Sequence, residues 1–256
     1  MSEQNYRFIF IVGAEGSGTT MLTRILSAPK NAVGLGGNFT TIKDSEKEAF
    51  ALVEQFDNAN ADLWDRKASH EICLRAKGEL PRLISRLRHL EDYAKVSHVV
   101  YKRSAPFFKD DRFRPDLADL PEIFEDLRII LIYRDPRACT FSALRRGFGE
   151  NLRQCAVITE EQLTYLAAQL ATLDAASYRV ISYEKFCAEP EALTSQLAEF
   201  CGLPEMALGR AVIKEKLDPA TNDRWQQELT AADRDFLNKF FDDRRLAQWQ
   251  LILDKF

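Results

Sequence analysis

The sequence predicts an α/β protein with three α/β/α layers, in which helices cover both faces of a central parallel sheet. Short apolar segments rich in β-branched and aromatic residues alternate along the chain with longer segments of helical periodicity. The apolar segments are hydrophobic on both faces, so we expect the sheet to be covered on two sides. Ligands of such sheets bind at the carboxyl ends of the strands.

The chain begins with a strand, a glycine loop and a helix. Residues 8–12 (FIFIV) form a short apolar run that predicts a buried strand. After the loop, TTMLTRILSA carries Met21, Leu22, Ile25 and Leu26 at helical spacing. The order is therefore strand, loop, helix.

The same arrangement occurs a second time. Residues 129–133 (IILIY) predict a strand, and Asp135 can cap a following helix that Pro136 opens at its first position. Two further strands are predicted at residues 98–101 and 179–183. Helical patterns at residues 160–173 and 190–203 complete the expected alternation.

We expect one domain over residues 1–256, because the glycines and prolines form no linker-like cluster and no repeat occurs. Residues 44–95 are charged and helical in pattern, and ELPRLISRLRHL is the best amphipathic stretch. This insertion is either a cap over a binding site or a pair of surface helices.

Composition limits the class of protein. Of the 256 residues, 46% are hydrophobic and 29% are charged, which is typical of a soluble globular protein with a large core. A net charge of −4 argues against general nucleic-acid binding. Five cysteines without a CxxC pair suggest neither disulfides nor a zinc site. The apolar run at 8–12 is too short to be a signal peptide or a membrane span, so we expect a cytoplasmic protein without membrane insertion.

The first loop has the spacing of a phosphate-binding loop. Gly13 is followed by four residues, then by Gly18, Thr19 and Thr20, but the lysine that should follow the second glycine is Thr19. Glycines let the backbone N–H groups approach an anion, and the helix that follows directs its positive end there. Without the lysine, the loop suits a nucleoside triphosphate with magnesium poorly. A 5'-phosphate bearing one further group fits better.

Two motifs together resemble those of sulfotransferases that use 3'-phosphoadenosine 5'-phosphosulfate (PAPS). GAEGSGTTML is similar to the family's loop for the 5'-phosphosulfate, and IILIYRDPRACTFSAL is similar to its signature for the 3'-phosphate. Arg134 and Ser142 stand at the spacing of that second signature. An arginine offers a fork of donors to a phosphate dianion, and the serine adds a hydroxyl. The resemblance implies a P-loop NTPase-like sulfotransferase fold and PAPS as the donor, without a metal.

Weaker similarity continues toward the C-terminus. The stretch VISYEKFCAEPEALTSQLAEFCGLP resembles the family's strand, Tyr-Glu and helix, and residues 222–230 resemble a segment that covers the cofactor. Tyr183, Glu184 and Trp225 are equally compatible with core or surface positions. The resemblance is poorest at residues 44–95, where an acceptor-specific insertion is expected. The cofactor-binding residues that it implies are Glu15, Gly16, Ser17, Gly18, Thr19, Thr20, Arg134, Ser142, Tyr183 and Arg224.

Lys102 is the candidate catalytic residue. It lies in VVYKRSAPFF, where family members that modify proteins or carbohydrates carry a lysine at a strand end, next to the transferring sulfuryl group. A cation there would neutralise charge on the oxygen that leaves. The alternative is a solvated lysine beside Arg103.

The sequence departs from the family in two places. Family members carry Arg or Lys where this chain has Gly16, and Glu15 precedes it. A carboxylate that faced the bound anion would oppose binding, so we expect Glu15 to point away or to pair with a cation. The second departure is at Gly37 and Asn38, where related enzymes often place a catalytic glutamate.

The base that takes the acceptor's proton stays unassigned. His98, Asp44 and Glu46 are candidates by residue type. We favour a buried structural role for His98, and exposed helical positions for His70 and His89.

The sequence thus predicts transfer of a sulfuryl group to a hydroxyl of a carbohydrate or small-molecule acceptor, with adenosine 3',5'-bisphosphate (PAP) as the product. Two alternatives stay open. One is a phosphotransferase with the same loop architecture, and the other is a non-catalytic nucleotide-binding protein, which the glycine at position 16 favours.

Overall fold

The structure is a computed structural model. It describes residues 6–34, 95–102, 120–215 and 217–242, the backbone of residues 35, 103 and 104, and the separate residues 77, 78, 84, 117 and 246. Almost all of the predicted insertion at 44–95 lies outside the described residues, as do Asp44, Glu46, His70 and His89.

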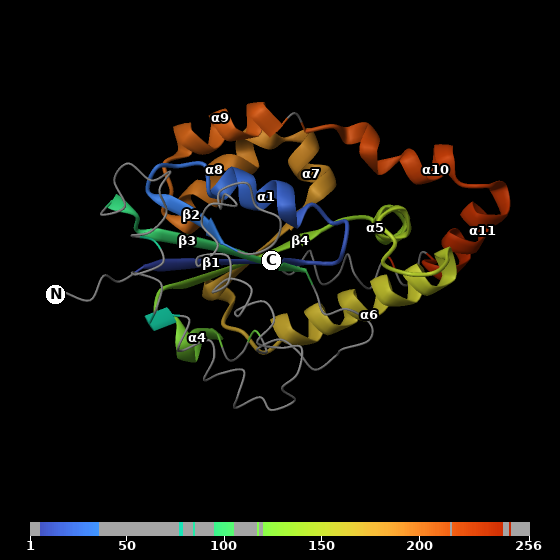
Figure 1. The fold of residues 1–256 in the computed structure, drawn as a ribbon, viewed down its shortest axis with the longest axis horizontal. Helices are drawn as coiled ribbons and strands as arrows, with labels where there is room; N and C mark the ends of the chain where they lie inside the picture. Colours follow the sequence, from blue (N-terminus) through green and yellow to red (C-terminus); the bar gives the residue numbers. More distant parts are fainter. Residues whose placement is uncertain are drawn as a thin grey trace.

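A five-stranded parallel sheet forms the centre of the molecule (Figure 1), with the strand order β2-β3-β1-β4-β5. All four neighbouring pairs are parallel, which confirms the predicted class of sheet. The strands are β1 (Arg7–Gly13), β2 (Ala32–Leu35), β3 (His98–Ser104), β4 (Leu127–Tyr133) and β5 (Tyr178–Ser182). The four-residue β2 is the one strand of this sheet that the sequence analysis does not predict.

Helices cover both faces of the sheet, as expected. Figure 1 shows α1 (Thr19–Leu26), α7 (Tyr183–Ala188), α8 (Pro190–Cys201) and α9 (Glu205–Glu215) on one face, and α4 (Leu120–Ile123) and α6 (Leu152–Leu170) on the other. The remaining helices lie at one end of the sheet or in connections: α5 (Pro136–Arg145), η4 (Ala175–Ser177), η5 (Pro219–Asn222), α10 (Arg224–Glu228) and α11 (Ala231–Phe240).

The alternation of side chains along β1 divides the core in two. Phe8, Phe10 and Val12 pack into the cluster on the α6 face, whereas Ile9 and Ile11 pack against α1 and α8 on the other face. All five are buried. A strand that is apolar on both faces has no stable position except between two helical layers, which explains why the run FIFIV lies at the centre of the sheet.

His98 lies at the amino end of β3, where it pairs in register with Arg7, while the loop starts from the opposite end of β1 at Gly13. Its Nε2 lies 3.1 Å from the carbonyl oxygen of Cys201, and its Nδ1 lies 2.8 Å from Oγ of Ser97. Burial first, and then the charge of Arg7, lower the pKa of His98. These contacts fit the structural role that we favoured.

Candidate nucleotide site

Three strand ends meet at the carboxyl edge of the sheet. β1 leads into the glycine loop before α1, β4 leads into Arg134 before α5, and β5 leads into Tyr183, the first residue of α7. Since β1, β4 and β5 are neighbours in the sheet, their ends lie side by side. This is where parallel sheets bind ligands.

The Ser17 hydroxyl and the start of α1 leave hydrogen-bonding groups available to an anion. Gly16 and Gly18 adopt φ angles of +84° and +103°, a conformation that favours glycine. Gly18 caps α1 without a side-chain hydrogen bond, and no acidic residue stands in the first turn. Oγ of Ser17 is buried without a hydrogen-bond partner. An orphaned hydroxyl beside a bare helix N-terminus fits a bound phosphate or sulfate group.

Close packing also requires glycine at positions 16 and 18. A Cβ at Gly16 would lie 2.7 Å from Cβ of Ser142, and a Cβ at Gly18 would lie 2.7 Å from Cδ2 of Tyr183. The loop therefore packs directly against α5 and the start of α7. The arginine or lysine that the resemblance leads one to expect at position 16 has no room there.

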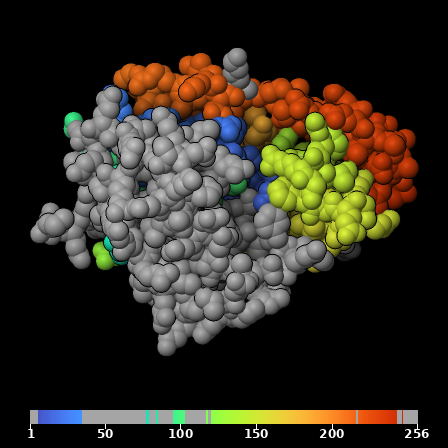
Figure 2. Space-filling view, in the orientation of Figure 1, coloured from blue at the N-terminus to red at the C-terminus, as the bar shows by residue number. Residues whose placement is uncertain are grey.

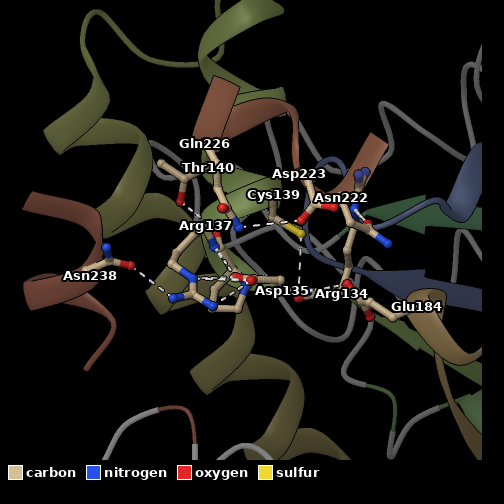
Figure 3. Close-up of polar contacts among 11 residues, drawn as sticks. Arg134, Asp135, Arg137, Cys139, Thr140, Glu184, Asn222, Asp223, Gln226 and Asn238 are labelled. Carbon is tan, nitrogen blue, oxygen red and sulfur yellow. Dashed lines mark hydrogen bonds and ion pairs between the residues drawn. The ribbon is translucent and has the colours of Figure 1, made fainter. Parts of the chain in front are cut away.

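Arg134 connects this loop to the C-terminal part of the chain. Nη1 donates to the carbonyl oxygen of Gly16 at 2.9 Å, and Nη2 donates to the carbonyl oxygen of Thr221 at 2.8 Å. Nε donates to Oδ1 of Asn222 at 2.9 Å, and Figure 3 shows both of these side chains. The arginine is 8% exposed. Sequence analysis placed Arg134 at an anion, but it could not reveal this second role as a bridge.

The ring of Tyr183 stacks against the Arg134 guanidinium. The Cζ atom of Arg134 lies 4.4 Å from the centre of the tyrosine ring, and the tyrosine hydroxyl lies 3.1 Å from Oγ1 of Thr221. Burial raises the pKa of this hydroxyl. Stacking on an aromatic face holds the planar guanidinium in one orientation.

A polar network fixes the start of α5 (Figure 3). Asp135 caps the helix by accepting from the backbone N–H of Arg137, and its carboxylate also pairs with the Arg137 guanidinium at 2.8 Å. The backbone N–H of Asp135 donates to Oε1 of Glu184. Arg137 further donates to Asn238 of α11 and lies 4.9 Å from the centre of the Trp225 ring. These contacts join α5 to α7, α10 and α11.

A cavity of about 370 Å³ opens between α5, Tyr183 and the segment that includes η5 and α10. Figure 2 shows the yellow-green atoms around α5 beside the red atoms of the C-terminal segment, at the end of the molecule where these elements meet. The residues that line the cavity are Arg134, Ala138, Phe141, Ser142, Arg145, Arg146, Tyr183, Thr221 and Arg224.

The cavity brings together four of the residues that the sequence singled out, namely Arg134, Ser142, Tyr183 and Arg224. The loop residues do not line it, yet they touch its wall at Arg134, Ser142 and Tyr183. The other five lining residues were not predicted from the sequence: Ala138, Phe141, Arg145, Arg146 and Thr221. Phe141 and Arg145 follow Ala138 at intervals that place all three on one face of α5, and this spacing could have revealed them.

Glu15 and Lys102 lie apart from the cavity. Glu15 is 7% exposed, and its backbone N–H donates to Oε1 of Gln162 on α6 at 3.0 Å. Its charge contributes to the raised pKa of the Cys139 thiol, which burial raises most. The side chain of Glu15 thus lies near Cys139, and it forms no ion pair with any residue that the structure describes.

Lys102 pairs in register with Ile11, two residues before β1 ends. Two residues of strand span about 7 Å, so the lysine starts short of the sheet edge. Strand alternation places it on the same face as Val100, which packs in the cluster beneath α1. This is the face on which the loop leads into α1. Among the described residues, no three His, Cys, Asp or Glu side chains are grouped so that they could hold a metal ion.

The sheet, the glycine loop at its carboxyl edge and the adjoining arginine-lined cavity define a P-loop-like α/β protein. A sequence model of the sulfotransferase family matches residues 9–207. The chain belongs to that family. A search among curated proteins found no similar sequence.

Solved sulfotransferases share this fold. The sulfotransferase of Alicyclobacillus acidocaldarius is 16% identical, with a TM-score of 0.57 over 98% of this chain and 96% of its own. The sulfotransferase domain of the Synechococcus PCC 7002 olefin synthase is also 16% identical, with a TM-score of 0.54 over 94% and 96% of the two chains. Mouse sulfotransferase SULT7A1, solved in complex with PAP, is 10% identical, with a TM-score of 0.54 over 99% and 89%.

In the described part of the chain, no helix combines the length and the apolar character that a membrane span requires.

Proposed function

We propose that this sulfotransferase uses PAPS as its donor and transfers the sulfuryl group to a hydroxyl of a carbohydrate or another small molecule. The observation that carries the proposal is the hydrogen bond between Arg134 and Gly16, because it joins the loop to the cavity. A loop suited to a 5'-phosphosulfate thereby adjoins a cavity suited to a 3'-phosphate. PAPS carries both groups on one nucleotide.

The residues present fit this donor. The orphaned Oγ of Ser17, the hydroxyls of Thr19 and Thr20 and the N-terminus of α1 supply donors at the loop. At the cavity, Arg134 and Ser142 supply a guanidinium and a hydroxyl to the 3'-phosphate. We propose that Tyr183 and Arg224 complete the nucleotide site. We also propose that Glu15 contributes through its backbone, whose N–H donates to Gln162 and holds the loop in place, and not through its carboxylate.

The reaction exchanges one sulfur–oxygen bond for another. The acceptor oxygen forms a bond to sulfur as the bond between sulfur and the phosphate oxygen breaks, and the hydroxyl proton leaves to a base or to water. The products are a sulfate ester, PAP and a proton. Donors that are already oriented toward the departing phosphate oxygen stabilise its developing charge. We propose that Lys102 contributes to this stabilisation from the face of the sheet beneath α1.

Lys102→Ala tests that assignment. The variant should lower kcat by roughly 10-fold to 1,000-fold while it leaves the dissociation constant of PAP nearly unchanged, because the charge is needed in the transition state rather than in the bound ground state. Turnover with labelled PAPS and calorimetric titration with PAP measure the two quantities separately. Unchanged turnover would remove Lys102 from the mechanism.

A non-catalytic nucleotide-binding protein is the second candidate, and Gly16 is the observation that favours it. A phosphotransferase is a weaker alternative, since Thr19 replaces the lysine that a triphosphate needs. We also propose a cytoplasmic location, because Cys139, Cys155, Cys187 and Cys201 are buried and unpaired.

Titration with PAP, with ATP and magnesium, and with GTP separates these functions. The proposal expects PAP to bind most tightly by a wide margin, and magnesium-dependent binding of ATP would favour the phosphotransferase instead. A screen of hydroxylated acceptors with labelled PAPS then tests catalysis. Tight PAP binding without turnover on any carbohydrate or small hydroxylated acceptor would leave the non-catalytic protein as the better interpretation.

A further inference from the structure

The cavity carries more positive charge than the matched motifs account for. Arg134 and Arg224 lie in stretches that resemble the family, whereas Arg145 and Arg146 lie beyond those stretches, at the end of α5. None of the nine lining residues is acidic. Two of the four arginines lie near carboxylates outside the lining, Arg145 at 3.7 Å from Glu228 and Arg224 at 3.9 Å from Asp218. A phosphate dianion carries about −1.5 to −2 charges near neutral pH, so it suits a cavity with this excess of positive charge.

Arg134 by itself cannot satisfy a phosphate dianion. A guanidinium has five N–H donors, and three of those of Arg134 are engaged by Gly16, Thr221 and Asn222. Two donors are left for a ligand. A phosphate dianion presents three terminal oxygens with several acceptor sites, so further donors must come from other side chains.

Arg145 and Arg146 are placed to supply them. Arg145 is the last residue of α5 and Arg146 is its C-cap. They follow Ser142 by three and four residues, which puts them one helical turn further along the cavity wall. The Arg145 guanidinium lies 3.7 Å from Glu228, and both of these side chains are about half exposed. The Arg146 side chain forms no hydrogen bond or ion pair with any residue in the described part of the chain.

We propose that Arg145 and Arg146 are specificity-determining residues that make the cavity select nucleotides with a 3'-phosphate. This inference rests on the proposed function. Arg146 pairs with the 3'-phosphate directly. Arg145 leaves the carboxylate of Glu228 and pairs with the 3'-phosphate when the nucleotide binds. Glu228 therefore competes with the nucleotide for Arg145. An exposed pair at 3.7 Å is weak enough to be exchanged in this way.

The experiment compares PAP with 5'-AMP, which lacks the 3'-phosphate, by calorimetric titration. The double variant Arg145→Gln, Arg146→Gln should bind PAP roughly 10-fold to 100-fold more weakly than the wild type, and 5'-AMP with unchanged affinity. Glu228→Gln should bind PAP more tightly, because it removes the competing carboxylate. Arg210→Gln is the matched control, since Arg210 is an exposed helical arginine that does not line the cavity.

The outcomes separate the two proposals. A wild-type protein that does not bind PAP would overturn the proposed function itself. A wild-type protein that binds PAP, together with a double variant that binds it equally well, would overturn this inference alone. An equal loss of affinity for PAP and 5'-AMP would also overturn it. The gain of Glu228→Gln cannot arise from misfolding, so it supports the inference even if the double variant is unstable, and its absence contradicts the exchange at Arg145.

Discussion

At the scale of single residues, Arg134 combines two functions that sequence patterns treat separately. We propose that its guanidinium binds the 3'-phosphate, and in the structure it holds the loop at Gly16 against the segment at Thr221 and Asn222. Arg134→Ala should therefore weaken the binding of PAP by about 2–5 kcal/mol, because one partner of buried, charge-assisted contacts is removed. Calorimetric titration measures the loss, with Arg210→Ala as the control.

Arg134→Lys sharpens this test. Lysine keeps the positive charge but lacks the planar fork, and it cannot reach Gly16, Thr221 and Asn222 in the same geometry. It should recover a part of the affinity that alanine loses. Full recovery would show that charge alone matters and would contradict the role of Arg134 as a bridge.

Gly16 leads to a prediction that opposes the pattern of the family. Gly16→Arg restores the residue type found in relatives, yet the backbone there has φ +84° and a Cβ would lie 2.7 Å from Ser142. The variant should lose stability, by about 1–3 kcal/mol from the backbone conformation alone. Gly209→Arg is the matched control, because a Cβ at Gly209 meets nothing within 4 Å. Urea unfolding of both variants measures the difference, and a Gly16→Arg protein as stable as the control would contradict the described packing.

At the scale of elements, the start of α5 determines where Arg134 and Ser142 lie. Asp135 caps this helix and pairs with Arg137. Asp135→Ala should reduce the free energy of unfolding by about 1–2 kcal/mol, since a helix cap is lost. Asp135→Asn should cost less because an asparagine can still cap. Chemical denaturation provides the measurement.

The control for this element is Asp235→Ala, which breaks the exposed pair with Lys239 on α11 and should change stability by about 0.5 kcal/mol or less. If Asp135→Ala costs no more than this exposed pair, the cap does not stabilise α5.

The elements also show how far the sequence could be interpreted. The apolar runs that became β1 and β4 were predictable because burial on both faces leaves a strong local signal. The presence of Arg134 and Ser142 in one cavity was predictable, because Arg134 follows a strand and Ser142 lies at a fixed distance in the next helix. The four-residue β2 was not, since a strand this short is defined mainly by its neighbour β3.

At the scale of the whole molecule, the site depends on contacts that no local pattern contains. Thr221 and Asn222 reach Arg134 from 87 and 88 residues away, through the short η5 helix whose sequence carries no periodic signal. The lack of room at Gly16 arises from the approach of α5 and is invisible in the sequence. Only the tertiary structure reveals these features.

The stability of the whole fold should depend on pH through His98. Burial lowers the pKa of this imidazole below its ordinary value of 6.5, with a further contribution from Arg7. As the pH falls through 6.5, His98 becomes protonated in the unfolded chain but stays neutral in the folded protein. The unfolded state then binds more protons, so the free energy of unfolding decreases. The urea midpoint of the wild type should therefore fall between pH 7.5 and about pH 5.5.

The comparison variant is His98→Gln. It is expected to be less stable at every pH, because contacts with Ser97 and Cys201 are lost, but its midpoint should change less across the same interval. Equal slopes for the two proteins would show that His98 does not titrate as its burial requires.

The bridge formed by Arg134 also bears on the order in which the protein is completed during synthesis. Its acceptors lie 118 residues earlier and 87 and 88 residues later in the chain. The five strands and the glycine loop are synthesised before residues 221 and 222. Until those two residues are added, Arg134 has one of its three acceptors, so the proposed nucleotide site is completed only after they are made.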